Sequence, residues 1–180
     1  MDPMKGSHVK LLAFDFLSLT QNASSSSSSS SSSASGAVFL YKKCRPVSRA
    51  ETLGVVVSRE FKANKFLKFL IDDGTGCVPC ILWLNHLNSP YFSRRNPFNV
   101  RVLAEKANDH ASQIQIGVLA RIRGRVTAYR GTLQITVTDV LLERDPNAEI
   151  LHWLDCIRLA RNCYDRSINL PNLQKQQRRF

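Results

Sequence analysis

The chain has 180 residues, 43% of them hydrophobic, with 25 Lys and Arg against 14 Asp and Glu and a net charge of +11. Such a composition is normal for a globular core and excludes wholesale disorder. The charge suggests a polyanionic partner, with nucleic acid the leading candidate and an anionic membrane surface the weaker one.

No stretch approaches the ~20 consecutive apolar residues that span a bilayer, so no membrane segment is expected. The five cysteines are scattered, which favours a reducing compartment, the cytosol or the nucleus.

The N-terminal part divides into two segments. Residues Val9 to Leu19 form an apolar patch interrupted by Lys10 and Asp15, a poor signal peptide. We expect residues 1–23 to supply a short strand or an anchor that docks on the main domain. A serine run, Ser24 to Ser33, follows. Because such a tract buries no apolar area, residues 24–36 are expected to be a flexible linker.

The main domain, expected over residues 37–144, starts with short apolar runs separated by turn signals. Strands are predicted at 53–57, 65–71 and 77–84. An Asp-Asp-Gly-Thr-Gly turn at 72–76 joins the second and third as a hairpin. Pro79 within the third run indicates an edge strand or a bulge.

The second half of this domain starts with an irregular stretch, 85–98, in which Pro90 and Pro97 are expected to break any helix. A helix is predicted over 100–112 and strands over 116–126 and 133–138. In the last run Leu133, Ile135 and Val137 share one face. A C-terminal helix is expected over 145–165, starting at Asp145-Pro146, and a basic polar tail over 166–180.

Five short strands with a helix between the third and fourth predict a mainly β fold: a single five-stranded OB-fold barrel with a C-terminal helix. A small barrel of SH3 type is the alternative. The helix between the third and fourth strands favours the OB fold.

Basic and aromatic residues gather in the second half of the barrel. Alternation puts Arg121, Arg123 and Arg125 on one strand face, a cationic row suited to phosphates along a groove. Tyr129, among the arginines, is a candidate to stack on unpaired bases, and Trp83, predicted to point outward, is a candidate either to stack on bases or to contact a partner protein. The candidate nucleic-acid-binding residues are Trp83, Tyr91, Arg94, Arg95, Arg121, Arg123, Arg125, Tyr129 and Arg130. The alternatives are a solvated polar face and, for Trp83, packing beneath the Tyr91-Phe92 loop.

The C-terminal helix carries a wide apolar face. The candidate partner-binding residues are Ile150, Trp153, Leu154 and Ile157, at helical spacing. The opposite face is expected to carry His152, Asp155, Arg158 and Arg161. Either this apolar face closes the bottom of the barrel, or it packs on a partner's helix; the difficulty of hiding both Trp153 and Leu154 favours the partner.

No catalytic, metal or cofactor site is predicted. Cys77 and Cys80 lie three apart on an extended strand, so their side chains should point to opposite faces, a poor geometry for shared chelation. Asp72 and Asp73 are typical turn residues. The four histidines lie apart in sequence, and we find no phosphate loop or nucleophile elbow. The chain is not expected to be an enzyme.

Several of these segments together resemble the Stn1 subunit family of the CST telomere-capping complex, in its short plant-type form. The segments are Leu53-Gly54-Val55-Val56, Phe69 to Gly76, Cys80-Ile81-Leu82-Trp83, Arg123-Gly124-Arg125 and Glu149 to Trp153. The resemblance covers most of Val47 to Asp165 and also Val9 to Leu19. The serine tract departs from the family pattern.

The resemblance implies more than the composition does. Stn1 is similar to the middle subunit of replication protein A, with a C-terminal helix that pairs with the small OB-fold subunit Ten1. The family also joins the large subunit Ctc1, binds single-stranded telomeric DNA, protects chromosome ends and assists DNA polymerase alpha–primase. It implies a nuclear, telomeric location, and base stacking by aromatics at the positions of Trp83 and Tyr129. The alternatives are a protein-interaction OB module or a general replication-protein-A-like subunit.

Overall fold

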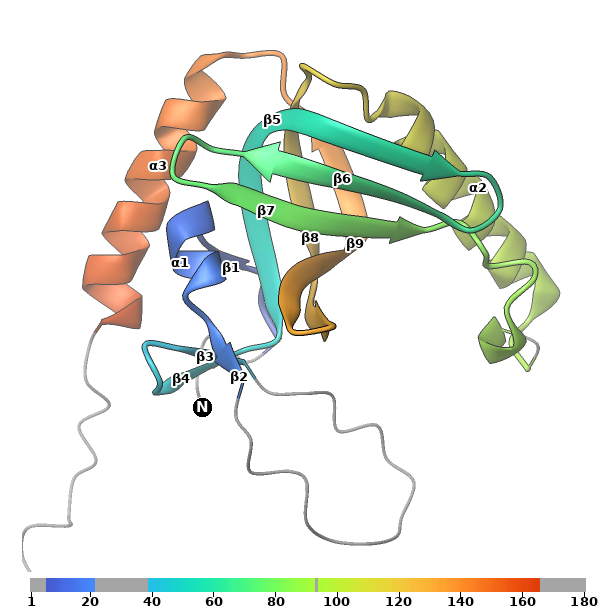
Figure 1. Cartoon of the computed structure of the whole chain (residues 1–180), viewed down its shortest axis with the longest axis horizontal. Coiled ribbons are helices and arrows are strands. Elements are labelled where there is room, and N and C mark those ends of the chain that lie inside the picture. The colour runs from blue at the N-terminus through green and yellow to red at the C-terminus, as the bar shows by residue number, and fades with distance from the viewer. Residues whose placement is uncertain (1–5, 22–38, 93, 166–180) are drawn as a thin grey trace, which may run out of the picture.

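The computed structural model describes residues 6–21, 39–92 and 94–165 (Figure 1). The serine tract and the basic tail predicted from the sequence fall in 22–38 and 166–180, outside the described residues. Among the described residues, no helix is both long and apolar enough to cross a membrane.

The centre of the molecule is a strongly curved sheet. Its strands are β5 (Arg49–Lys62), β6 (Phe66–Asp72), β7 (Cys77–Trp83), β8 (Leu119–Tyr129) and β9 (Thr132–Leu142). They lie in the order β5-β6-β7-β9-β8, and β8 also pairs with β5, so the sheet curls round on itself. The helix α2 (Pro97–Gln113) connects β7 to β8. The predicted mainly β OB fold is confirmed.

Two glycines allow the strands to approach each other closely at the curl. A Cβ atom at Gly54 would lie 2.3 Å from the carbonyl oxygen of Asp72, and one at Gly124 would lie 2.2 Å from that of Thr136. No side chain fits at such distances. This explains the glycine in each of the Leu-Gly-Val-Val and Arg-Gly-Arg segments.

The core forms from the inward-pointing residues, which alternate with outward-pointing ones along each strand. On β6, Leu67, Phe69 and Ile71 are buried while their neighbours are only partly covered. On β9, Ile135 and Val137 are buried, on the face predicted from the sequence. The alternation works because successive side chains of a strand point to opposite sides.

An N-terminal layer covers one end of the barrel. It comprises β1 (Val9–Lys10), which runs parallel to β5, the short helix α1 (Ala13–Leu17), and a small sheet of β2 (Thr20–Gln21), β3 (Phe39–Tyr41) and β4 (Arg45–Val47). The N–H of Ala13 donates to the buried Asp73 carboxylate at 2.7 Å. The layer buries Leu11, Phe16 and Phe39, so it shares the barrel's core.

Two sequence predictions about proline need correction. Pro97 does not break a helix; it is the first residue of α2, where its missing N–H is not needed, and the Asn96 side chain caps the turn. β7 is not an edge strand, since it lies between β6 and β9. Its pairing with β9 covers only Cys80 and Ile81, so Pro79 falls just before that ladder and breaks no hydrogen bond in it.

The C-terminal helix α3 (Asn147–Leu159) follows β9 and continues as a π-helical turn, η2 (Ala160–Tyr164). It lies along the side of the barrel away from α2 (Figure 1). Its end is held to the N-terminal layer by the rings of Tyr41 and Tyr164, 5.8 Å apart, and by an ion pair of Lys42 with Asp165 at 2.7 Å.

Candidate nucleic-acid interface

Three aromatic rings and a lysine form a continuous surface on the outer face of β6, β7 and the β8–β9 hairpin. The Trp83 ring lies edge-to-face against the Phe66 ring, with 6.2 Å between centroids. The Lys68 ammonium lies 4.8 Å from the Phe66 ring centroid and 5.9 Å from that of Tyr129. We call Trp83, Phe66, Lys68 and Tyr129 the aromatic strip.

Strand register assembles this strip. Because Leu67 and Phe69 enter the core, Phe66 and Lys68 must point outward. The β6–β7 ladder sets Phe66 opposite Trp83 and Lys68 opposite Ile81. Directly opposed residues point to the same side of a sheet. The side chains of Phe66, Trp83, Lys68 and Ile81 therefore share one face.

The same face continues across the remaining strands. Ile81 pairs with Thr136 on β9, and Thr136 pairs with Arg125 on β8. Lys68, Ile81, Thr136 and Arg125 therefore form a row across four strands. The ladder confirms that Ile81 lies on the same side of β7 as Trp83. Unlike Trp83, Ile81 is buried, since β6 and β9 flank it on both sides. It forms the floor of the surface.

Further cations border the strip. The Arg130 guanidinium lies 5.3 Å from the Tyr129 ring centroid, and the Lys62 ammonium lies 5.2 Å from that of Phe66. Lys62 also pairs with Glu60 at 3.2 Å, although both side chains are more than half exposed. Exposed rings beside cations can stack on bases while the cations meet phosphates.

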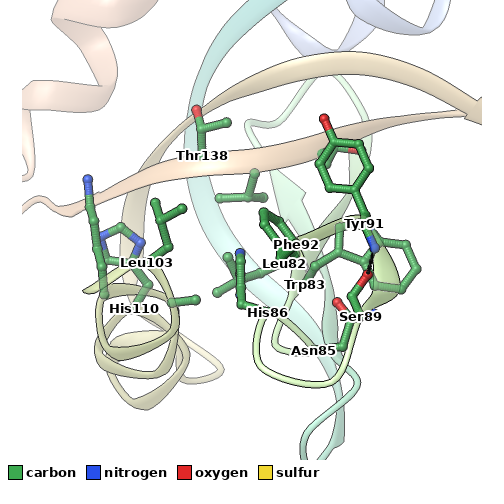
Figure 2. Close-up of a pocket in the computed structure, with 14 residues that line it drawn as sticks. Leu82, Trp83, Asn85, His86, Ser89, Tyr91, Phe92, Leu103, His110 and Thr138 are labelled. Atoms are coloured by element: carbon green, nitrogen blue, oxygen red, sulfur yellow. Dashed lines mark hydrogen bonds between the residues drawn. The ribbon is translucent and has the colours of Figure 1, made fainter. Parts of the chain in front are cut away.

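Two of the aromatic residues predicted from sequence lie in this strip, and both are accessible: Trp83 is 42% exposed and Tyr129 is 54% exposed. Trp83 lies where either alternative for it is possible. It presents area to solvent, and it also lines a recess with Tyr91 and Phe92 (Figure 2).

Tyr91, Arg94 and Arg95 lie outside the strip, in the segment between β7 and α2. The Arg95 guanidinium lies 5.4 Å from the ring centroids of both Tyr91 and Phe92, and those rings meet edge-to-face at 5.1 Å. Arg94 is exposed. The structure therefore brings Tyr91 and Arg95 together as a second aromatic and cationic group, beyond Trp83.

The predicted cationic row on β8 needs correction. The three arginines share one face, but Arg121 and Arg123 are held in ion pairs: Arg121 meets Glu51 at 2.9 Å and Glu143 at 2.8 Å, and Arg123 meets Glu51 at 2.6 Å. Glu51 arrives on β5, paired antiparallel with β8. These acids are distant from the arginines in sequence or directly follow the next strand, and they hold Arg121 and Arg123 in ion pairs. Of the three arginines, only Arg125 lies in the row with Lys68.

The buried Glu51 carboxylate is ionised. Burial alone would raise its pKa, but the hydrogen bonds from Arg123 and Arg121 and their positive charges outweigh burial, so the pKa of Glu51 lies below its ordinary value. The pKa of Arg121 is correspondingly raised: its partial burial works against the charge, and its bonds to Glu143 and Glu51 overcome that effect. This cluster is therefore structural, beneath α3 and β1.

The faces of α3 also differ from the prediction. His152 was expected on the polar side, yet it is buried against the barrel together with Ala148 and Cys156. Trp153 was expected to face a partner, but its indole N–H donates to the Asp73 carbonyl at 3.0 Å, so it faces its own barrel. Small side chains at 148 and 156 let this side of α3 approach closely, and this determines the helix rotation.

The rest of the apolar face of α3 is uncovered. Ile150, Leu154 and Ile157 are exposed, as predicted for partner-binding residues, and Leu151 joins them. Lys10 holds the helix from its other side through an ion pair with Asp155 at 2.7 Å. A row of exposed branched side chains on a firmly held helix is suited to packing against another protein.

Two polar groups are buried under α3, His152 and Cys156. The His152 ring nitrogen Nε2 lies 3.4 Å from the Cys156 sulfur. Burial first, then the Arg121 charge, lowers the pKa of His152. Burial raises the pKa of Cys156 to about 12, so its thiol stays protonated and unreactive.

Among the residues that the structure describes, no three His, Cys, Asp or Glu side chains lie close enough to hold a metal ion. Cys77 is exposed and Cys80 is buried, so their predicted orientation to opposite faces is confirmed. Asp73 accepts hydrogen bonds from the Thr75 N–H and hydroxyl at 2.9 and 2.7 Å, as expected of a turn residue.

Phe66 and Lys68 are candidate interface residues that sequence reasoning missed. The signal was present in Lys65-Phe66-Leu67-Lys68, where the alternation with Leu67 and Phe69 puts Phe66 and Lys68 on the outer face. The hairpin around the 72–76 turn could have set Phe66 opposite Trp83, but nothing local indicated that Tyr129 would lie beside Lys68, because the β8–β9 hairpin comes from a distant part of the chain.

Comparison with known proteins gives a consistent result. Residues 52–143 match the family model described as an OB-fold nucleic acid binding domain. The CST complex subunit STN1 of Arabidopsis thaliana is 50% identical over 161 residues, which cover 89% of this chain and 94% of the relative. The STN1 subunit of Ailuropoda melanoleuca is 30% identical over 184 residues, which cover 98% of this chain and 47% of the relative, so the chain spans about half the length of that relative.

Two solved structures share the fold at low identity. A chain of the Schizosaccharomyces pombe Stn1–Ten1 complex superposes with a TM-score of 0.53 at 13% identity, covering 69% of this chain and 79% of that one. A chain of a replication protein A heterotrimer bound to single-stranded DNA superposes with a TM-score of 0.59 at 16% identity, covering 84% and 93%.

Proposed function

This chain belongs to the family of CST complex subunit STN1 and carries an OB-fold nucleic acid binding domain, and from that membership we propose that it binds single-stranded telomeric DNA as a subunit of such a complex. The resemblance drawn from the sequence motifs is thereby confirmed. The family consists of binding subunits and not of enzymes.

The observation that carries the DNA-binding proposal is the aromatic strip. Its rings are accessible, and Lys68 lies between Phe66 and Tyr129 at 4.8 and 5.9 Å from their centroids. Every base has a face that can stack on such rings, and Lys68, Arg130 and Arg125 supply charge for the connecting phosphates. This geometry favours single strands of varied sequence. In a duplex the bases are stacked on each other and unavailable.

The first test is a titration of a labelled single-stranded oligonucleotide at two salt concentrations, with the full chain alone and with its small OB-fold partner. Trp83→Ala and Tyr129→Ala should each weaken binding about 10-fold, because a base–aromatic stack contributes ~1–3 kcal/mol. Binding should also weaken steeply with salt, since phosphate contacts release counterions.

Phe14→Ala is the matched control, because Phe14 is an exposed aromatic on α1, away from the strip; it should bind as the wild type does. Absence of binding in every condition, or a Trp83→Ala variant that binds with unchanged affinity, would contradict the proposal.

A second part of the proposal concerns protein partners. The uncovered residues Ile150, Leu151, Leu154 and Ile157 are suited to a Ten1-like small OB-fold subunit, and a chain of the Stn1–Ten1 complex shares this fold. We further propose association with a Ctc1-like large subunit, support of DNA polymerase alpha–primase, and a place in the nucleus at telomeres, where the assembly protects chromosome ends.

A further inference from the structure

The recess that Trp83 lines with Tyr91 and Phe92 does not include Tyr129. It has a volume of about 470 Å³ and lies between α2, the segment that follows β7, and β9. Figure 2 shows Leu103 and His110 of α2 on one side and Trp83, Tyr91 and Phe92 on the other. Trp83 belongs both to this recess and to the aromatic strip, so the two surfaces are continuous. We call it the Trp83 recess.

Aromatic side chains form part of the wall of the Trp83 recess, beside the aliphatic Leu82, Leu103, Ala107 and Val137. Tyr91 is 71% exposed, and its ring meets that of Phe92 edge-to-face. The His86 ring lies against Phe92, with 5.0 Å between centroids. Flat walls of this kind fit a flat ligand, and the volume exceeds what one side chain or one base requires.

Polar groups that carry no charge line the same space. Burial lowers the pKa of both His86 and His110, and Lys106 lowers that of His110 further against the opposing Asp139 and Asp109, so both rings are neutral at pH 7. Asn85, Ser89 and Thr138 line the same space and add uncharged hydrogen-bonding groups.

Two cations border the recess. None of the residues lining it is acidic. Lys106 lies at its wall and is held by Asp139 at 3.0 Å, while Arg95 packs on Tyr91 and Phe92 at the outside. An aromatic interior with neutral hydrogen-bonding groups and cations at its edge matches a nucleotide, with the base inside and the phosphate at the edge.

We propose that the Trp83 recess takes a single unstacked base of the bound strand, beyond the bases that stack on the aromatic strip. This inference rests on the proposed function. An apolar side chain of a partner protein would fit the walls but would offer nothing to the polar lining residues Asn85, Ser89 and Thr138, whereas a base edge offers donors and acceptors. Continuity through Trp83 also allows one strand to reach both surfaces.

The experiment uses the full chain and a set of single-stranded oligonucleotides, each with one abasic site moved stepwise along the strand. In the wild type, abasic sites at the positions that stack on the aromatic strip should weaken binding, and one further position should weaken it about 10-fold through loss of the base in the recess. Tyr91→Ala should weaken binding of the intact strand by a similar factor and abolish the further penalty at that one position. Tyr91→Phe, which keeps the ring, should restore it.

Phe98→Ala is the matched control, since Phe98 is as exposed as Tyr91 but does not line the recess; it should leave every penalty unchanged. Two results overturn the inference. One is a Tyr91→Ala variant with unchanged affinity. The other is a Tyr91→Ala loss of affinity for the strand that is equal at all abasic positions. A Tyr91→Ala loss that affects only the capture of a partner protein overturns the inference in the same way.

The results that would refute this inference differ from the results that would refute the proposed function. If Trp83→Ala weakens binding but Tyr91→Ala does not, the aromatic strip binds DNA and the recess does not hold a base. If neither wild type nor variants bind the strand, the proposed function fails and the inference fails with it.

Discussion

The arginines of β8 lie in different surroundings although they alternate along one strand. Glu51 has a side chain only 4% exposed and receives both Arg121 and Arg123, whereas Arg125 is exposed. A carboxylate this deeply buried is favourable only while its partners remain. Glu51 therefore decides which arginines of β8 are held in ion pairs.

Glu51→Gln should lower the free energy of unfolding by about 3 kcal/mol, because it removes the buried carboxylate that Arg121 and Arg123 share and leaves Arg121 with Glu143 alone. Urea unfolding at pH 7 measures this, with Glu105→Gln on the exposed side of α2 as the control.

Since the pKa of Glu51 is lowered by folding, the unfolded chain takes up the proton first as the pH falls. The difference between wild type and variant should therefore shrink below pH 4.5, the ordinary pKa of a Glu; a difference independent of pH would contradict the ionised pair.

At the scale of elements, α3 shows how packing chooses between two apolar sides of one helix. Ala148, His152 and Cys156 face the barrel, four residues apart, and Trp153 is tied to the carbonyl of Asp73. The larger aliphatic residues remain outside, with Leu154 58% exposed. Hydrophobic periodicity identifies the helix but does not say which part of a wide apolar face turns inward.

Leu154→Gln should weaken binding of the small OB-fold partner about 10-fold or more, because apolar residues at the centre of an interface carry most of the affinity. Folding of the isolated chain should be unchanged, since Leu154 is exposed. Calorimetric titration of the partner into both chains measures the effect. Arg158→Gln, on the same helix and exposed, is the control; equal affinity for Leu154→Gln and wild type would exclude this face as the docking surface.

At the scale of the whole molecule, the segment before the serine tract belongs to the barrel's core. β1 adds to β5, and α1 presents its Ala13 and Phe14 amides to Asp73 and Thr75 of the β6–β7 turn. Trp153 of α3 reaches the same turn. The 72–76 turn thus joins three parts of the chain that are distant in sequence.

Phe16→Ala should destabilise the whole protein by about 4 kcal/mol, because it removes a fully buried ring and leaves a cavity. Phe14→Ala, two residues away and 70% exposed, should change stability little. Thermal or denaturant unfolding of both variants measures the contrast. If Phe16→Ala alters only the N-terminal layer and leaves the barrel's unfolding midpoint unchanged, the two do not form one cooperative unit.

The arrangement of the molecule also separates its two proposed interfaces. α2 borders the Trp83 recess, and α3 lies on the opposite side of the barrel (Figure 1). A strand on the aromatic strip and a partner on α3 therefore need not compete, which fits a subunit that works within an assembly.

The sequence by itself determined the five barrel strands, the helix between the third and fourth of them, and the outward position of Trp83. These features follow from local alternation, which tells on which side of its own strand each residue lies. Only the tertiary structure decided which side chains meet. Glu51 reaches Arg121 and Arg123 across 70 and 72 residues of chain, and Lys68 meets Tyr129 only because the sheet curls round. The physical reason is that hydrogen-bonded ladders between distant strands bring these partners together. The alternation of residues along one strand does not indicate which distant strand pairs with it.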